Sequence, residues 1–273
     1  MGLKSMSAEQ LRQFIRTHHE KNYVLVDVRQ PEEYRRGHIP GARLLPLRDF
    51  VQSIDQLPTD KEVVIYCHGG GRSMAAAVML EEEAPDASIA NLTGGMLAWD
   101  GVRLADAPQV RLFEGQTRTQ MLKTAMDLEK GAQRFYEAVV SAHGGKPWAQ
   151  VFARLAKAEV AHARSVYAFQ RRDEARLAPF EELFEQCQGE VLEGGMTLKT
   201  ALEQLSQVPD DACLRLVEMG LQIEYAAYDL YRTLSDDSDV DEATRQAFIS
   251  LAQAEKAHLQ ILIDTTAQCA DNA

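Results

Sequence analysis

The sequence has few cysteines and no long apolar run, and each absence excludes a class of protein. Its 273 residues include four cysteines, none of them arranged as a Cys-x-x-Cys pair. This spacing argues against a disulfide framework, a zinc ribbon and a rubredoxin-type iron site. No apolar stretch is long enough to cross a bilayer, and the N-terminus lacks the apolar core and cleavage site of a secretory signal. We therefore expect a cytoplasmic protein without a membrane span.

Positive charge is scarce relative to negative charge. The 29 lysines and arginines are outnumbered by 41 aspartates and glutamates, which gives a formal net charge of −12. Such a protein repels phosphate backbones and anionic lipids, so we expect neither a nucleic acid nor a membrane as a partner. The remaining composition, 45% hydrophobic and 26% charged residues, is typical of a globular protein.

The chain changes character between its first hundred residues and the rest. Short β-type runs alternate with helical runs at first, whereas nearly everything after residue 116 has helical periodicity. A chain of this length is also long for one compact core. We predict an α/β domain over residues 1–106, a linker over 107–115 that contains Pro108, and an all-α domain over 116–273.

Secondary structure in the first part is indicated by two compact apolar runs, residues 23–26 and 63–66, which are typical of buried parallel strands. Ser7 with Gln10 forms a capping-box pattern for a helix that ends at about Thr17. A second helix is expected from Arg72 to Glu82. These elements predict a three-layer α/β domain.

In the second part, helical periodicity predicts four long helices, at about 116–142, 147–172, 210–234 and 241–268. Shorter helices are expected in the joint between the second and third, at 180–192 and 198–205. The expected stops and caps of the long helices are Gly144 and Gly145, Pro147, Asp210 or Asp211, and Asp239 or Asp241. Such a long joint lets the second and third helices run parallel.

A cysteine stands where the strand 63–66 ends. Cys67 is followed by the loop His68, Gly69, Gly70, Gly71, Arg72 and Ser73, and then by a predicted helix. The glycines allow several N–H groups to point at one spot, and the positive end of the helix adds to their field. This pattern predicts an anion-binding loop and a nucleophilic thiol of lowered pKa, able to carry a persulfide. The alternative is a buried cysteine beside an ordinary glycine turn, and His68 is equally compatible with tuning the thiol and with facing water.

Several further motifs surround this loop and occur in one order along the chain. They are residues 26–29 (Val-Asp-Val-Arg), 31–34 (Pro-Glu-Glu-Tyr), 37–42 (Gly-His-Ile-Pro-Gly-Ala) and 91–99 (Asn-Leu-Thr-Gly-Gly-Met-Leu-Ala-Trp). Together with the cysteine loop they resemble a single-domain rhodanese over about residues 5–106. The resemblance implies a sulfurtransferase in which Cys67 takes sulfane sulfur from thiosulfate or a persulfide and passes it to a thiol or cyanide-like acceptor. Four residues separate Cys67 from Arg72, the spacing that the family uses for sulfur and not for phosphate. We expect a structural role for Asp27 and Arg29, which can pair at the strand end.

The helical half repeats itself at an offset of about 95 residues. The offset relates two Glu-x-x-His segments, two earlier glutamates and two tyrosines: Glu159 and His162 with Glu255 and His258, Glu129 with Glu224, and Tyr136 with Tyr231. Residues three apart lie on one helical face, so each Glu-x-x-His can present both side chains to one point. A solitary Glu-x-x-His is usually a solvated surface pair, but two repeated copies favour a metal site.

Four carboxylates and two imidazoles facing inward from four helices form the ligand set of di-metal carboxylate bundles. Two divalent cations would offset the cost of burying those carboxylates. Each tyrosine lies almost two turns beyond its glutamate, so it can hydrogen-bond a ligand or simply pack the core.

Over about residues 116–268 the pattern resembles the rubrerythrin branch of the ferritin-like superfamily. The resemblance implies a ferritin-like four-helix bundle that holds two iron ions, with manganese or zinc as alternatives, and reacts with oxygen or peroxide. An external electron donor and a homodimer formed through the helical domain are also expected. The pattern departs from rubrerythrins at Ala227, where they carry a further glutamate, and in having no cysteine pairs for a second iron site.

These patterns support three hypotheses of different kinds. The first is a sulfurtransferase fused to a di-iron bundle with oxidase or peroxidase activity on oxygen, peroxide or a sulfur species. The second is a metal storage or sensing protein in which the rhodanese part carries persulfide or docks a partner. In the third, the bundle is mainly an oligomerisation device.

Overall fold

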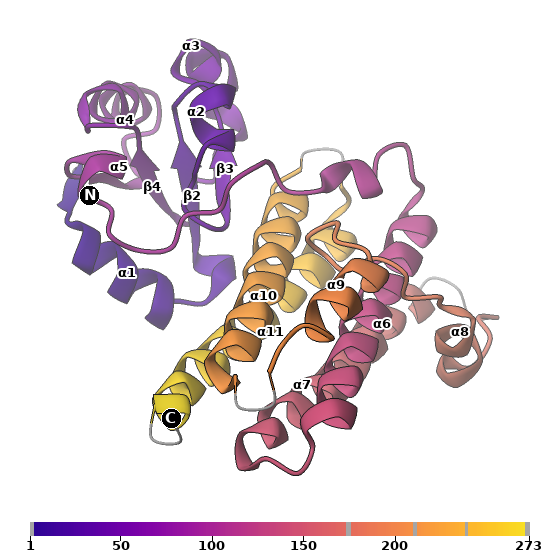
Figure 1. Ribbon diagram of the computed structural model, residues 1–273. Helices are drawn as coiled ribbons and strands as arrows, with labels where there is room; N and C mark the ends of the chain where they lie inside the picture. Colours follow the sequence, from indigo (N-terminus) through magenta and orange to yellow (C-terminus); the bar gives the residue numbers. More distant parts are fainter. Residues whose placement is uncertain (1–2, 173–175, 210–211, 238–239, 271–273) are drawn as a thin grey trace. The chain divides into compact units, whose positions relative to one another are not determined.

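The structure of this protein is a computed structural model that describes residues 3–172, 176–209, 212–237 and 240–270 (Figure 1). The chain divides into two compact units, one of residues 1–107 and one that comprises most of residues 108–273. Across the described ranges, no helix is both long and apolar enough to cross a membrane.

The first unit is built on a sheet that has five parallel strands among the residues described, in the order β1-β5-β4-β2-β3. The strands are β1 (Lys4–Met6), β2 (Tyr23–Asp27), β3 (Ala42–Leu44), β4 (Glu62–Tyr66) and β5 (Ser88–Leu92). Strands β2 and β4 contain the two strands predicted from the apolar runs. The parallel α/β architecture of this part is therefore confirmed.

Both faces of this sheet are buried. Successive side chains of a strand point to opposite sides, so neighbouring residues of one strand lie in different core clusters. On β2, Val24 and Val26 share a core cluster with Ala77 of α4 (Gly71–Glu83). Leu25, between them, belongs to a second cluster with Leu11 of α1 (Ala8–Thr17). The unit thus has the three layers expected. Its short helical segments are η1 (Glu20–Asn22), α2 (Pro31–Arg35), α3 (Leu47–Phe50), η2 (Val51–Gln56) and α5 (Gly95–Ala98).

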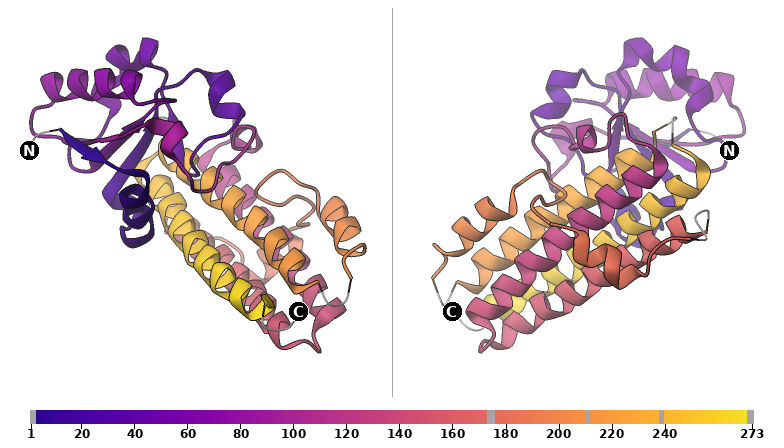
Figure 2. Two further views of the ribbon diagram at one scale, coloured as in Figure 1. Left: turned by 60° about the vertical axis from the view of Figure 1, so that its left-hand side comes forward. Right: turned by 90° about the vertical axis from the view of Figure 1, so that its right-hand side faces the viewer.

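The second unit is helical, and among its described residues four long helices run side by side (Figure 2). These are α6 (Arg118–His143), α7 (Gln150–Arg171), α10 (Cys213–Ser235) and α11 (Glu242–Ala270). Helix α6 packs against α7, α10 against α11, and α7 against α11. Their bounds agree closely with the four long helices predicted from periodicity.

The helix ends have local causes that the sequence indicates. Gly144 follows the last residue of α6, and Pro147 opens the short segment η4 (Pro147–Ala149) before α7. The Asp241 carboxylate accepts hydrogen bonds from the N–H groups of Ala243 and Thr244, both at 3.0 Å, and so caps α11. The other predicted caps, Asp210, Asp211 and Asp239, lie outside the described residues.

The joint between α7 and α10 differs from its prediction. Helix α9 (Leu198–Leu205) has the predicted bounds, but α8 (Phe180–Gln186) ends six residues before the predicted end at Leu192. The helix expected over 187–192 was wrong because this backbone packs against α6. Gly189 takes a left-handed conformation there, with φ +57°, and a helix cannot continue through it.

Part of the predicted linker, residues 107–115, is built into the helical unit. Residues Val110–Leu112 form the segment η3, and Phe113 is buried with its ring 5.8 Å from that of Phe248. This stretch therefore contributes to the core of the second unit.

Cys213 and Cys269 form a disulfide that joins the start of α10 to the end of α11. The expectation that the cysteines build no disulfide framework misses this bond, because the two residues are 56 positions apart and only the antiparallel helix pair brings their Cα atoms to 5.4 Å. Cys67 and Cys187 carry free thiols. Disulfides persist mainly in oxidising surroundings.

Replacing both bonded cysteines, as Cys213→Ser with Cys269→Ser, is expected to lower the free energy of unfolding by about 4 kcal/mol, because the closed loop no longer restricts the unfolded chain. Urea denaturation under non-reducing conditions measures this change. Cys187→Ser is the matched control and should have little effect. A double variant as stable as the parent protein would show that the bond does not constrain the chain.

Candidate functional site

The thiol of Cys67 sits at the end of β4 and at the start of α4, and its side chain is buried. The N–H of Gly70 donates to its sulfur at 3.1 Å and the hydroxyl of Ser73 at 3.4 Å. Gly70 has φ +96°, a conformation that allows the chain to curl around the sulfur and that glycine adopts without strain. Burial would raise the pKa of Cys67, but the hydrogen bonds from Ser73, Gly70 and Gly69 outweigh it and lower the pKa.

A second glycine turn, at Gly94 and Gly95, packs against the backbone of this loop. The N–H groups of Met96 and Leu97 donate to the carbonyls of Cys67 at 2.8 Å and His68 at 3.0 Å. A Cβ on Gly95 would lie 2.2 Å from the Cys67 carbonyl oxygen, so only glycine permits this close approach. The sequence motif over residues 91–99 therefore has a physical role, which is to hold the cysteine loop in shape.

Arg72 of the predicted anion loop is engaged by a partner that the residue pattern did not assign. Its guanidinium makes two hydrogen bonds, of 2.7 and 2.8 Å, to the carboxylate of Glu33. These bonds lower the pKa of Glu33 to about 2. The side chain of His68 is exposed at the loop surface. The donors that this loop directs at the sulfur are therefore the N–H of Gly70 and the hydroxyl of Ser73.

Asp27 and Arg29 form a buried ion pair at the end of β2, with 2.6 Å between Asp27 Oδ2 and Arg29 Nη2. The same nitrogen donates to the carbonyl of Gly37 at 2.8 Å. The pair thus connects the end of β2 to the loop that follows α2, which is a structural role.

Iodoacetamide labelling of Cys67 as a function of pH tests the lowered thiol pKa. A depressed pKa means that thiolate is already present below the ordinary thiol value, so the rate profile should have its midpoint below about 8.5. Ser73→Ala removes a donor and should move the midpoint upward. Burial raises the pKa of Cys187 to about 11, so labelling at neutral pH reports on Cys67.

Mass spectrometry of the labelled peptide gives the rate at each pH, with Cys67→Ala as the control for background labelling. A midpoint at or above the ordinary value in the parent protein would contradict a lowered pKa of the Cys67 thiol.

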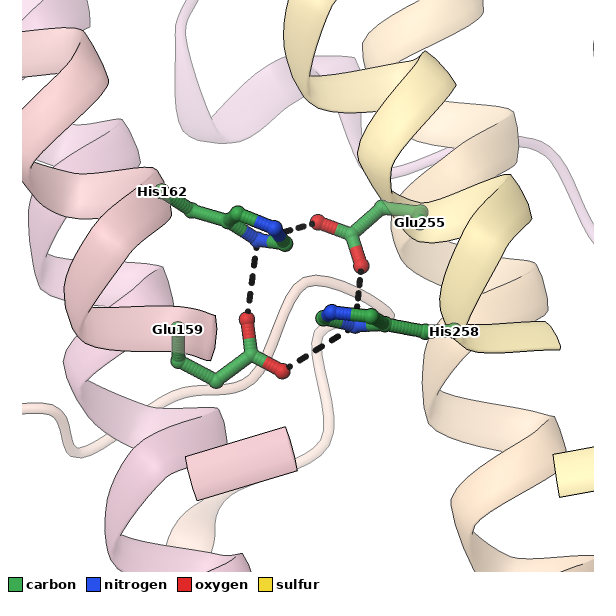
Figure 3. A group of neighbouring side chains, drawn as sticks. All are labelled: Glu159, His162, Glu255 and His258. Atoms are coloured by element: carbon green, nitrogen blue, oxygen red, sulfur yellow. Dashed lines mark ion pairs between the residues drawn. The ribbon is translucent and has the colours of Figure 1, made fainter. Parts of the chain in front are cut away.

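In the helical unit, six of the predicted residues converge on one buried point. His162 Nδ1 lies 3.1 Å from Glu159, 3.1 Å from Glu255 and 3.2 Å from Glu129. His258 Nδ1 lies 3.0 Å from Glu224, 3.2 Å from Glu255 and 3.4 Å from Glu159. Figure 3 shows the two Glu-x-x-His pairs facing each other from α7 and α11, with each glutamate between the two imidazoles.

This cluster lies between two apolar core clusters of the helical unit. On α6, Leu128 belongs to one cluster and Ala132 to the other, with Glu129 between them. On α10, Ala227 and Ile223 flank Glu224 in the same way. All six residues are at most 8% exposed. The four helices therefore enclose these six residues as a buried polar layer between two apolar clusters.

Negative charge is concentrated in this layer. An imidazole nitrogen donates one hydrogen bond, yet Nδ1 of each histidine faces carboxylates from three helices. Burial raises the pKa of Glu159 well above its usual range and that of Glu224 to about 7. Burial lowers the pKa of His258, but Glu224 and its neighbours outweigh it and raise it to about 11. Glu159 Oε1 lies 3.4 Å from His258 Nδ1 and Glu255 Oε1 lies 3.1 Å from His162 Nδ1, but neither oxygen has the geometry of a hydrogen bond. This donor set fits two divalent cations.

Tyr136 and Tyr231 connect the two halves of the repeat. The hydroxyl of Tyr136 donates to Glu224, and that of Tyr231 donates to Glu129 at 2.6 Å. Both tyrosines are fully buried. Each therefore holds the carboxylate of the other half in place, and both also pack the core.

A fifth acidic residue at this layer was missed by the sequence reasoning. Glu193, in the joint between α8 and α9, is 2% exposed. Its only sequence signal is its place among Gly189, Gly194 and Gly195 in a segment that was expected to be partly helical.

Comparison with known proteins assigns the first unit to a family. The rhodanese-like domain family matches residues 7–101. A sulfurtransferase of Allochromatium vinosum is 38% identical over 79 residues, which cover 29% of this chain and 73% of that protein. YtwF of Bacillus subtilis is 36% identical over 101 residues, which cover 37% of this chain and 94% of YtwF. YqhL of the same organism is 43% identical over 77 residues, 28% of this chain, and the match spans 60% of YqhL.

These matches fall on the part of the chain that holds the cysteine loop, its supporting glycine turn and the parallel sheet. They leave more than half of the chain outside the aligned region. Through its N-terminal unit, the chain belongs to the rhodanese-like domain family.

Proposed function

We propose that this protein is a sulfurtransferase that carries sulfane sulfur as a persulfide on Cys67, fused to a ferritin-like bundle that holds two iron ions. The sulfur part is supported by the hydrogen bonds that gather at the Cys67 sulfur and by the relative from A. vinosum that is named a sulfurtransferase. The metal part rests on one observation, the buried layer in which two histidines face four glutamates.

Sulfur transfer at Cys67 proceeds in two displacements. The thiolate attacks the outer sulfur of thiosulfate, the S–S bond of the donor breaks, and sulfite leaves with the electron pair. A thiol or cyanide acceptor then attacks the outer sulfur of the persulfide, and the Cys67 thiolate leaves. The N–H of Gly70 and the hydroxyl of Ser73 stabilise the thiolate at the start and at the end. Backbone N–H groups of the loop would likewise hold the terminal persulfide sulfur.

The contacts of the buried layer also suggest which residues would hold two metal ions. Glu159 and Glu255 each lie close to both histidines and would be ligands together with them. Glu129, which lies close to His162, and Glu224, which lies close to His258, would be the remaining ligands. Iron bound there would supply one-electron redox chemistry toward oxygen, peroxide or a sulfur species. The protein's own part is to orient the carboxylates through Tyr136 and Tyr231 and to keep the layer dry.

A metal storage or sensing role is the second candidate, with the rhodanese-like unit as persulfide carrier or docking module. It is favoured by the burial of the layer, because all six residues are at most 8% exposed and access for a substrate is restricted. Redox turnover separates the two candidates.

Sulfur transfer is tested by measuring thiocyanate formed from thiosulfate and cyanide. Cys67→Ala should lose activity by on the order of 10³-fold, because it removes the atom that carries the sulfur. Cys187→Ala is the matched control and should keep activity, since its thiol lies in the other unit and has a raised pKa. Full activity in Cys67→Ala would rule out the persulfide mechanism.

Metal binding is tested by loading the full chain with ferrous iron without oxygen and measuring iron by elemental mass spectrometry. About two irons per chain are expected for a di-metal carboxylate bundle, and Glu159→Ala with Glu255→Ala should lose them. The matched control is Glu137→Ala with Glu218→Ala, two exposed glutamates of α6 and α10. Peroxide added to the reduced, loaded protein should then change its visible absorption.

The outcomes of this experiment divide the candidate functions. Iron that binds but shows no spectral change would favour storage or sensing. Failure of the parent protein to retain iron would leave a sulfurtransferase joined to a helical interaction module.

A further inference from the structure

The loop between α8 and α9 lies next to the buried layer of glutamates and histidines. Its start is fixed to α6, where the Asp127 carboxylate accepts hydrogen bonds from the N–H groups of Gln188 at 2.7 Å and Gly189 at 3.2 Å. Two residues beyond Glu129, a Cβ on Gly131 would lie 2.4 Å from the carbonyl oxygen of Val191. The loop backbone therefore lies directly on α6, beside one of the candidate ligands.

The same loop reaches α10 on its other side. A Cβ on Gly194 would lie 2.8 Å from the Cβ of Ala226, which is two residues beyond Glu224. The turn is closed tightly, because Leu192 donates to Met196 and Gly195 donates to Leu192, both at 2.8 Å. Residue 193 is thus carried between α6 and α10, at the level of the two glutamates that these helices contribute.

Glu193 occupies this position with a buried carboxylate that the protein leaves partly unsatisfied. The side chain is 2% exposed, and its Oε2 has no hydrogen-bond partner among the described residues. The charged groups that raise its pKa, after burial itself, are Glu129, Glu159 and Glu255. A buried carboxylate facing other carboxylates is strongly unfavourable unless a cation lies between them.

We propose that Glu193 is a seventh ligand of the metal centre, delivered by the loop and not by any of the four long helices. This inference rests on the proposed di-metal site and adds one carboxylate to it. Glu193 has no counterpart in the repeat, since the other six residues form two matched sets of three. The two metal positions therefore differ, and one of them has an additional oxygen ligand.

The test uses the full chain, freed of metal with a chelator and titrated with cobalt(II), whose visible absorption reports coordination number. The variant is Glu193→Gln, which keeps the size and the hydrogen-bonding capacity of a protonated acid but removes the negative charge. Glu190→Gln is the matched control, because Glu190 belongs to the same loop and is exposed. Calorimetry gives the affinity of each site, and thermal unfolding gives the stability of the metal-free and loaded forms.

Glu193→Gln is expected to weaken one of two cobalt sites by at least about tenfold and to change the visible spectrum, while Glu190→Gln behaves as the parent does. The metal-free variant should unfold at a higher temperature than the parent, because a glutamine does not have to be neutralised when it is buried, yet it should gain less on binding cobalt. A neutral, space-filling Glu193 would leave affinity and spectrum unchanged in Glu193→Gln, and that result overturns the inference. No cobalt binding by the parent protein would instead overturn the di-metal site itself.

Discussion

Four glutamates in the dry interior of a helical unit are the constraint on which much of this structure depends. Each buried carboxylate costs several kcal/mol unless positive charge lies close to it. The two histidines supply part of that charge, and His162 contacts three of the carboxylates. We propose that cations supply the rest. The hydroxyls of Tyr136 and Tyr231 hold two of the carboxylates in position by hydrogen bonds, and apolar clusters flank the layer on both sides.

The rhodanese-like unit also has to stabilise negative charge at a buried position, but on a single sulfur atom. Hydrogen-bond donors of its loop favour the negative charge on the Cys67 sulfur and lower the pKa of the thiol. These donors are fixed by the backbone, which a glycine turn at Gly95 supports at close range. One unit therefore stabilises negative charge with backbone dipoles, and the other does so with imidazoles and, as we propose, with metal ions.

Repetition explains the shape of the buried layer, and the loop explains its asymmetry. Two helix pairs with the same spacing of glutamate, tyrosine and Glu-x-x-His generate matched halves around the centre. The joint between α8 and α9 occurs once, and it places Glu193 on one side of that centre. In the metal centre that we propose, the two positions would therefore not be equivalent.

Local patterns in the sequence determined the parallel α/β unit, the long helices, the nucleophile Cys67 and the six inward-facing residues, because periodicity and fixed spacing depend only on neighbours along the chain. The tertiary structure alone decided the pairs that lie far apart in sequence. No rule of sequence spacing predicts these pairs, which are Arg72 with Glu33, Cys213 with Cys269, and Glu193 with the buried layer of glutamates and histidines. Residues 187–192 are not helical, because the contact of this backbone with Gly131 of α6 outweighs the local helix propensity.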